Sequence, residues 1–173
     1  MRYHGEVMDW SPFVVCPPDQ RAPATRGMGG PDGLGDRLRT AAFAERQAFA
    51  AFIWAADTLA DAPEELRAAW RRIGLEEKKH LDMLLTRMLE LGVEVAGRPV
   101  SDRLWRSLSA CKTAAEFSAH MREAEARGQA AEETFRRVLA DRDPVTAGIF
   151  GQIADDEAEH LALADSLAKS LYK

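Results

Sequence analysis

Two Glu-x-x-His motifs are the residues of this chain best suited to chemistry. They are Glu77-x-x-His80 and Glu157-x-x-His160, and they lie 80 residues apart. The chain has 4 histidines, so half of them occur in this one pattern. Residues at i and i+3 lie on the same face of a helix, where a carboxylate and an imidazole can bind one metal ion together. Each motif therefore predicts half of a metal site.

A glutamate precedes each motif by the same interval. Glu45 lies 32 residues before Glu77, and Glu125 lies 32 residues before Glu157. Mixed carboxylate and imidazole ligands suit redox-active iron or manganese. Four carboxylates and two neutral imidazoles together carry the charge that two divalent ions would balance. The pattern predicts a site for two metal ions with these six ligands: Glu45, Glu77, His80, Glu125, Glu157 and His160.

Other glutamates compete with Glu125 for its place in this set. Glu123 and Glu133 are near it in the sequence, and Glu132, seven residues further on, lies on a similar helical face. The matched spacing favours Glu125 as the ligand. The choice between Glu125 and Glu132 stays open on the sequence alone.

Four long helices are predicted to position these residues, because apolar residues recur at helical spacing on the same stripes. The stripe of the third helix, for example, includes Phe117, Val138 and Leu139. Helices are expected over residues 35–59 and 63–91, and two more open at Thr113 and at Asp143-Pro144. Between them, the connection 92–112 contains a predicted short helix over 101–110. The expected fold is all-α, a four-helix bundle with a long crossover.

The N-terminal segment has a different composition. Residues 1–33 are rich in proline and glycine and show no sustained periodicity, so we divide the chain into an irregular segment, 1–33, and a helical bundle, 34–173. Trp10, Phe13 and Val14 make the segment too apolar for a solvated tail. It is expected either to cover the bundle or contact another subunit, or else to be disordered.

Composition narrows the class of protein. The 173 residues are 46% hydrophobic and carry a net charge of −5, which indicates a globular domain and gives no reason to expect a nucleic-acid partner. No apolar run is long enough to span a membrane, and no apolar secretion signal opens the chain. Cys16 and Cys111 are expected to be free thiols. We therefore expect a cytoplasmic protein.

Four stretches around these glutamates and histidines carry a resemblance to a known superfamily. They are Ala44-Glu45-Arg46-Gln47-Ala48, Glu76-Glu77-Lys78-Lys79-His80, Glu125-Ala126-Arg127-Gly128 and Asp156-Glu157-Ala158-Glu159-His160. They resemble the ferritin-like di-iron carboxylate superfamily over residues 35–170. The run at Glu125 is similar to that of an uncharacterised group of bacterial ferritin-like proteins, and also to that of the tRNA hydroxylases that oxidise a modified adenosine.

This resemblance implies roles for individual residues. Carried over by position, it implies the same six metal ligands, with Glu77 and Glu157 bridging two iron ions or, as the alternative, two manganese ions. Asp156 resembles the carboxylate that orients a ligating histidine in such sites, and Glu76 holds the equivalent place in the other half.

The function expected from the resemblance is that of a di-iron oxidoreductase activating O₂ or peroxide, with the metal centre itself as the catalytic group. A monooxygenase or oxidase acting on an unknown small-molecule substrate is the first expectation. The chain has no Cys-x-x-Cys pair, so electrons are expected from an external donor. The alternatives are a non-catalytic iron-binding, storage or sensing protein, and a tRNA hydroxylase-like enzyme. The tRNA alternative would need exposed basic residues, for which the candidates are Arg103, Arg106, Arg122, Arg127, Arg136 and Arg137. A homodimer formed through apolar helix surface is a further alternative.

Overall fold

Two helical hairpins joined by a long crossover make up the protein. The computed structural model describes the backbone of residues 8–171 and the side chains of residues 8–162. Within this part of the chain the long helices are α1 (Pro31–Thr58), α2 (Glu64–Glu90), α4 (Ala114–Leu139) and α5 (Pro144–Leu171). The crossover contains a short 3₁₀ turn, η1 (Val95–Gly97), and the short helix α3 (Arg103–Leu108). The predicted all-α bundle with a helix in its crossover is confirmed.

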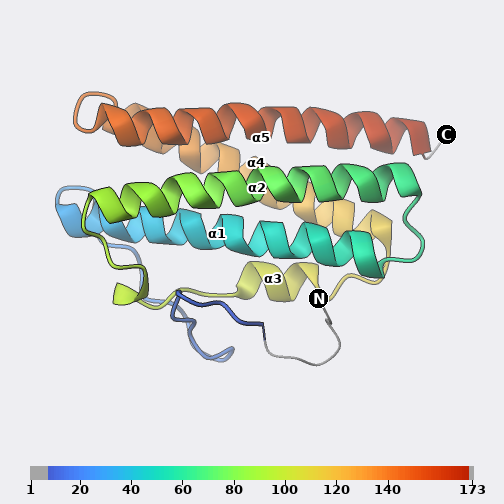
Figure 1. Cartoon of the computed structure of the whole chain (residues 1–173), viewed down its shortest axis with the longest axis horizontal. Helices are drawn as coiled ribbons and strands as arrows, with labels where there is room; N and C mark the ends of the chain where they lie inside the picture. The colour runs from blue at the N-terminus through green and yellow to red at the C-terminus, as the bar shows by residue number, and fades with distance from the viewer. Residues whose placement is uncertain (1–7, 172–173) are drawn as a thin grey trace.

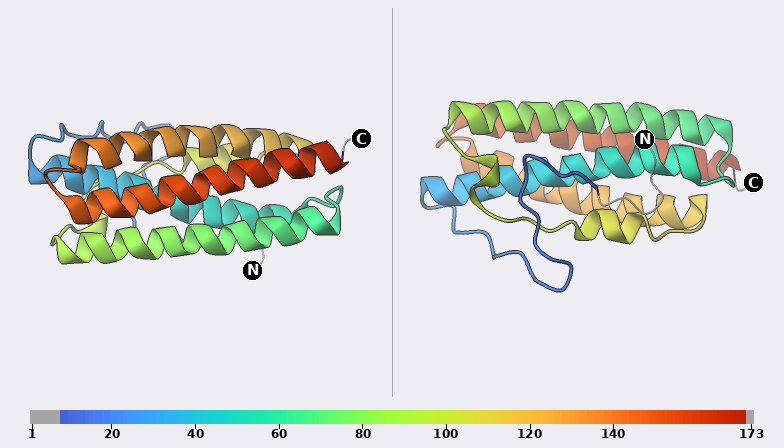
Figure 2. Two further views of the ribbon diagram at one scale, coloured as in Figure 1. Left: turned by 90° about the horizontal axis from the view of Figure 1, so that it is seen from above. Right: turned by 60° about the horizontal axis from the view of Figure 1, so that its bottom comes forward.

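The helices pair in chain order. α1 and α2 lie side by side as one hairpin, and α4 and α5 form the other (Figure 1). The crossover carries α3 along the outer side of α1 before the chain enters α4, and Figure 2 shows the long helices aligned along one common axis, with the two helices of each hairpin running in opposite directions. The contact between α2 and α5 brings the two hairpins together on the side that carries both Glu-x-x-His motifs.

Local signals fix the helix ends. Gly92 adopts a positive φ of 66° just after α2, a backbone conformation that favours glycine and ends the helix. Thr113, where this helix was predicted to open, caps α4 by accepting a hydrogen bond from the backbone N–H of Glu116 at 3.2 Å. The Glu116 carboxylate accepts a hydrogen bond from the backbone N–H of Lys112 at 2.8 Å. α1 begins at Pro31, earlier than predicted, because a proline and then Asp32 suit the first helical turn.

The apolar core is divided into two layers. On α2 the first layer ends at Ile73 and the second begins at Leu81, and Glu77 and His80 lie between the two. Val138 is 45% exposed, so its predicted place on the buried stripe of α4 is wrong. Leu139 and Phe117, predicted on the same stripe, are buried. The bundle thus keeps a polar layer between two apolar ones.

The N-terminal segment covers the bundle. Residues 8–30 contain no helix, yet Trp10 and Phe13 are buried and their rings lie 5.3 and 4.9 Å from the ring of Phe43 on α1. Backbone hydrogen bonds tie the segment to the crossover, from Val100 N–H to Val14 at 2.9 Å and from Cys16 N–H to Val100 at 2.8 Å. For the described residues the covering alternative is the one that the structure shows.

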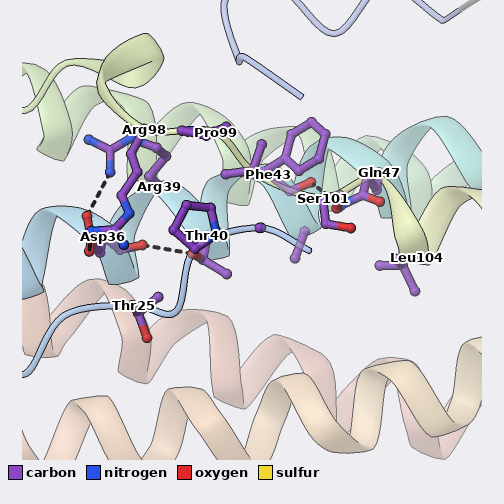
Figure 3. Close-up of a pocket in the computed structure, with 14 residues that line it drawn as sticks. Thr25, Asp36, Arg39, Thr40, Phe43, Gln47, Arg98, Pro99, Ser101 and Leu104 are labelled. Atoms are coloured by element: carbon purple, nitrogen blue, oxygen red, sulfur yellow. Dashed lines mark hydrogen bonds and ion pairs between the residues drawn. The ribbon is translucent and has the colours of Figure 1, made fainter. Parts of the chain in front are cut away.

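A buried ion-pair cluster fastens the segment and the crossover to α1. Asp36, only 2% exposed, accepts hydrogen bonds from Arg26 at 2.8 Å, Arg39 at 3.1 Å and Arg98 at 3.1 Å. The Arg26 hydrogen bond is the main reason that the pKa of Asp36 lies well below its usual value. Beside this cluster is a cavity of about 220 Å³ between the segment, α1 and the crossover (Figure 3). None of the six predicted metal ligands lines that cavity.

Candidate metal centre

All six predicted ligands are buried in the middle of the bundle. Their exposed fractions range from 0% at Glu77 to 8% at Glu125. Buried carboxylates are costly unless they are paired or bind a cation, so six ionisable groups in one buried layer require an explanation. α1, α2, α4 and α5 each place their ligands on the face that turns toward the bundle axis.

The ligand atoms form two overlapping groups. In each group all the atoms lie within 4.8 Å of one another. One group consists of Glu45, Glu77, His80 and Glu157, and the other of Glu77, Glu125, Glu157 and His160. Glu77 and Glu157 belong to both. These are the same two glutamates that the resemblance implies as bridges between two ions.

Each histidine is oriented by a carboxylate from the opposite hairpin. Nε2 of His80 on α2 lies 3.0 Å from Oδ2 of Asp156 on α5. Reciprocally, Nε2 of His160 on α5 lies 2.7 Å from Oε2 of Glu76 on α2. These bonds hold Nε2 outward and leave Nδ1 of both rings directed at the buried glutamates. Sequence reasoning found both carboxylates, but it could not tell which histidine each would contact.

Several buried polar atoms at the centre have no hydrogen-bond partner. They are both carboxylate oxygens of Glu77, Oε2 of Glu157 and Nδ1 of His80 and His160. Nδ1 of His160 lies 3.1 Å from Oε1 of Glu77 but forms no hydrogen bond of acceptable geometry with it. Unsatisfied buried polar atoms are rare in folded proteins, and here they are the ligand atoms that converge on the two groups. The residues therefore fit two metal ions in both geometry and donor type.

The buried glutamates and histidines of the centre shift one another's pKa values. Burial alone would lower the pKa of His80, but Glu45 and Glu77 outweigh it and raise that pKa to about 11. The pKa of His160 is raised to about 10, against its burial, by Glu157 and Glu77. Burial and then the charge of Glu77 raise the pKa of Glu45, while the two histidines hold the pKa of Glu77 at about 2 despite its burial.

Both α4 candidates for the fourth carboxylate are buried. Glu125 joins the group around His160, whereas Glu132, 6% exposed, lies outside both groups. The other competitors are surface residues: the Glu123 side chain is 72% exposed and that of Glu133 is 54% exposed. The structure thus favours Glu125 as the member of the six-residue set.

A small cavity reaches the outer side of the two histidines. It has a volume of about 200 Å³ and lies between α2 and α5. Its lining consists of Glu76, Lys79, His80, Met83, Gln152, Asp156, Glu159 and His160. Solvent can therefore approach the Nε2 side of both rings, while Nδ1 faces the buried glutamates.

Three further predictions from the sequence concern the cysteines, the basic surface and membrane spans. Cys16 and Cys111 are buried free thiols, as predicted. All six candidate arginines of the tRNA alternative are exposed, but Arg106, Arg127 and Arg136 pair with Asp102, Glu123 and Glu133. None of the helices within residues 8–171 combines the length and the apolar character needed to cross a membrane.

Comparison with known proteins relates this arrangement to a family and a fold. Residues 11–169 match the family described as "Protein of unknown function (DUF455)". No curated protein matches the chain. Among solved structures, the chain is similar to the bacterioferritin-related protein from Bacteroides fragilis, a dodecameric thioferritin, with a TM-score of 0.69, 17% identity, and coverage of 83% of this chain and 88% of that one. The fold is ferritin-like, and the chain belongs to the DUF455 family.

Proposed function

We propose that this protein is an oxidoreductase that binds two iron ions, with two manganese ions as the alternative. It would use these ions to oxidise a small-molecule substrate. The observation that carries the proposal is that two groups of buried ligand atoms share Glu77 and Glu157. Two redox-active ions bound there would supply activation of O₂ or peroxide for a monooxygenase or oxidase reaction.

The side chains of the protein have separate tasks in this proposal. Glu45 and His80 would bind one ion, Glu125 and His160 the other, and the shared glutamates both. Asp156 and Glu76 keep each imidazole turned so that Nδ1 faces the buried glutamates that would hold the ions. The apolar layers on both sides of the centre limit access of water to it.

Metal analysis of the full chain tests the proposal. Protein produced with ample iron is expected to contain about two iron or manganese ions per chain. A Glu77→Ala, Glu157→Ala double variant should lose both ions because it removes both shared carboxylates. An exposed-site control, Glu123→Ala, Glu133→Ala, should keep them. Absence of transition metal from wild type and variant alike, with no change in melting temperature on adding Fe(II), would reject the site.

Iron storage or sensing without catalysis is the second candidate. It is supported by the fold that the chain shares with a thioferritin from Bacteroides fragilis. Turnover with O₂, a reductant and substrate would favour the enzyme. Many irons per chain in an assembled shell would favour storage. For the enzyme we further propose an external electron donor and a cytoplasmic location.

A further inference from the structure

Glu132 on α4 is a buried carboxylate that the six-ligand set does not use. It is 6% exposed, and its Oε2 has no hydrogen-bond partner. Two other glutamates of α4 form ion pairs at the surface: Glu123 pairs with Arg127, and Glu133 pairs with Arg136. Burying a carboxylate that has no such ion pair costs folding free energy unless a bound ligand interacts with it.

The position of Glu132 connects it with the His80 half of the centre. It lies seven residues after Glu125, a rise of about 10 Å along the helix. Glu125 belongs to the ligand group of His160 and follows the part of α4 that packs in the first apolar layer, whereas Glu132 precedes Phe135 and Leu139, which pack in the second. On α2 the second layer begins at Leu81, directly after His80. α4 therefore presents one buried carboxylate to each half of the centre.

The Glu132 carboxyl group lies over Gly128, one turn earlier on α4. Side chains on a helix lean toward its N-terminus, so the Glu132 carboxyl group lies over the preceding turn. There its Oε1 is 3.9 Å from the place that a Cβ on residue 128 would occupy. This is ordinary van der Waals contact, so the Glu132 carboxylate lies directly over residue 128, on the side of its own Cα that faces Glu125.

The raised pKa of Glu132 agrees with a buried carboxylate that lacks a positively charged partner. Burial raises the pKa of Glu132 to about 7, the positive charge of His80 opposes that rise, and the negative charge of Glu77 adds to it. A cation bound beside His80 would supply the compensation that burial removes.

We propose that Glu132 is a seventh protein ligand of the metal centre and binds the ion on the His80 side. This inference rests on the proposed function, since it assumes that the centre binds divalent transition metal. With Glu132 the His80-side ion has five contributing residues, and the His160-side ion has four. The two positions are therefore unequal: the first ion binds on the His80 side, and the His160 side is the one left more open to an exogenous ligand.

Manganese binding to the intact chain tests this inference without any assay of activity. Mn(II) is titrated into metal-free wild type, Glu132→Gln and the matched surface control Glu133→Gln. Isothermal calorimetry provides the two dissociation constants, and electron paramagnetic resonance reports on the paired ions. Melting temperatures of the metal-free proteins check folding, and Glu132→Gln is expected to melt at or above the wild-type temperature because it removes an unpaired buried carboxylate.

The expected result is that Glu132→Gln weakens the tighter of the two binding steps at least about tenfold, as loss of one charged ligand does. The weaker step and the Glu133→Gln control stay at wild-type values. Two unchanged dissociation constants in a folded Glu132→Gln variant would overturn the seventh ligand and leave the proposed function standing. No Mn(II) binding by the wild-type chain would overturn both.

Discussion

Oδ2 of Asp156 lies 3.0 Å from Nε2 of His80, although the two residues stand on different hairpins. The partner contact, between Glu76 and His160 at 2.7 Å, crosses the bundle in the opposite direction. Each hairpin thus fixes the imidazole of the other. Orientation of both histidines depends on correct docking of the hairpins, not on either hairpin alone.

Replacing Asp156 should therefore weaken metal binding. In Asp156→Ala the His80 ring loses the acceptor that keeps Nδ1 facing the centre, and we expect affinity for Mn(II) to fall about 10- to 100-fold. The control is Asp155→Ala, an adjacent carboxylate whose side chain is 79% exposed. Equal affinities for the two variants in calorimetric titrations would mean that Asp156 does not position His80.

Metal affinity should rise with pH. In the metal-free protein both histidines are cationic at neutral pH, because the pKa of His80 is about 11 and that of His160 about 10. Metal ions bind neutral imidazole, so each histidine releases its proton on binding. Affinity should increase up to about tenfold per pH unit for each proton released.

Calorimetry in buffers of different ionisation enthalpy measures this proton release directly. We expect a net release at neutral pH that falls as the pH approaches the histidine pKa values. A dissociation constant that does not vary with pH, with no buffer dependence of the binding enthalpy, would contradict the protonated metal-free centre.

Loss of the Asp36 carboxylate should destabilise the fold. Asp36→Asn leaves Arg39, which is 5% exposed, with a buried uncompensated charge, and we expect a loss of about 3 kcal/mol in the free energy of unfolding. Because the pKa of Asp36 is depressed, its contribution is present above the unfolded-state pKa and is lost as the pH falls toward the folded-state value.

Urea unfolding at neutral and acid pH checks this prediction. Asp32→Asn is the control, because the Asp32 side chain is 72% exposed and pairs at the surface with Arg26. It should change stability by no more than about 0.5 kcal/mol. Similar losses of unfolding free energy in both variants would show that the buried cluster around Asp36 contributes no more to stability than the surface pair of Asp32 and Arg26.

The N-terminal segment should contribute to the stability of the bundle. Trp10→Ala removes a buried ring that contacts both Phe43 and Trp105, and we expect it to cost about 3 kcal/mol. Val14→Ala, at a residue 47% exposed in the same segment, should cost no more than about 0.5 kcal/mol. If thermal unfolding shows the same small loss for both, the segment does not stabilise the core.

Helix positions were predictable because their signals are local. The Thr113 cap, the Pro144 start and the glycine after α2 act within a few residues, and the observed helices agree with them. Burial of Phe43 and Gln47 was missed for the opposite reason. Both lie on the side of α1 that the segment and the crossover cover, and helical periodicity alone reveals only the side facing the other helices.

The sequence by itself determined the fold class and the six candidate ligands, because equal spacings on amphipathic helices place those residues on facing stripes. The tertiary structure decided which groups meet. Only docking of the hairpins brings Glu77 and Glu157 into both ligand groups, pairs His80 with Asp156, and encloses Glu132 together with Glu125. The physical reason is that contacts between helices depend on the relative rotation and depth of packing of the two hairpins, which no spacing within one helix encodes.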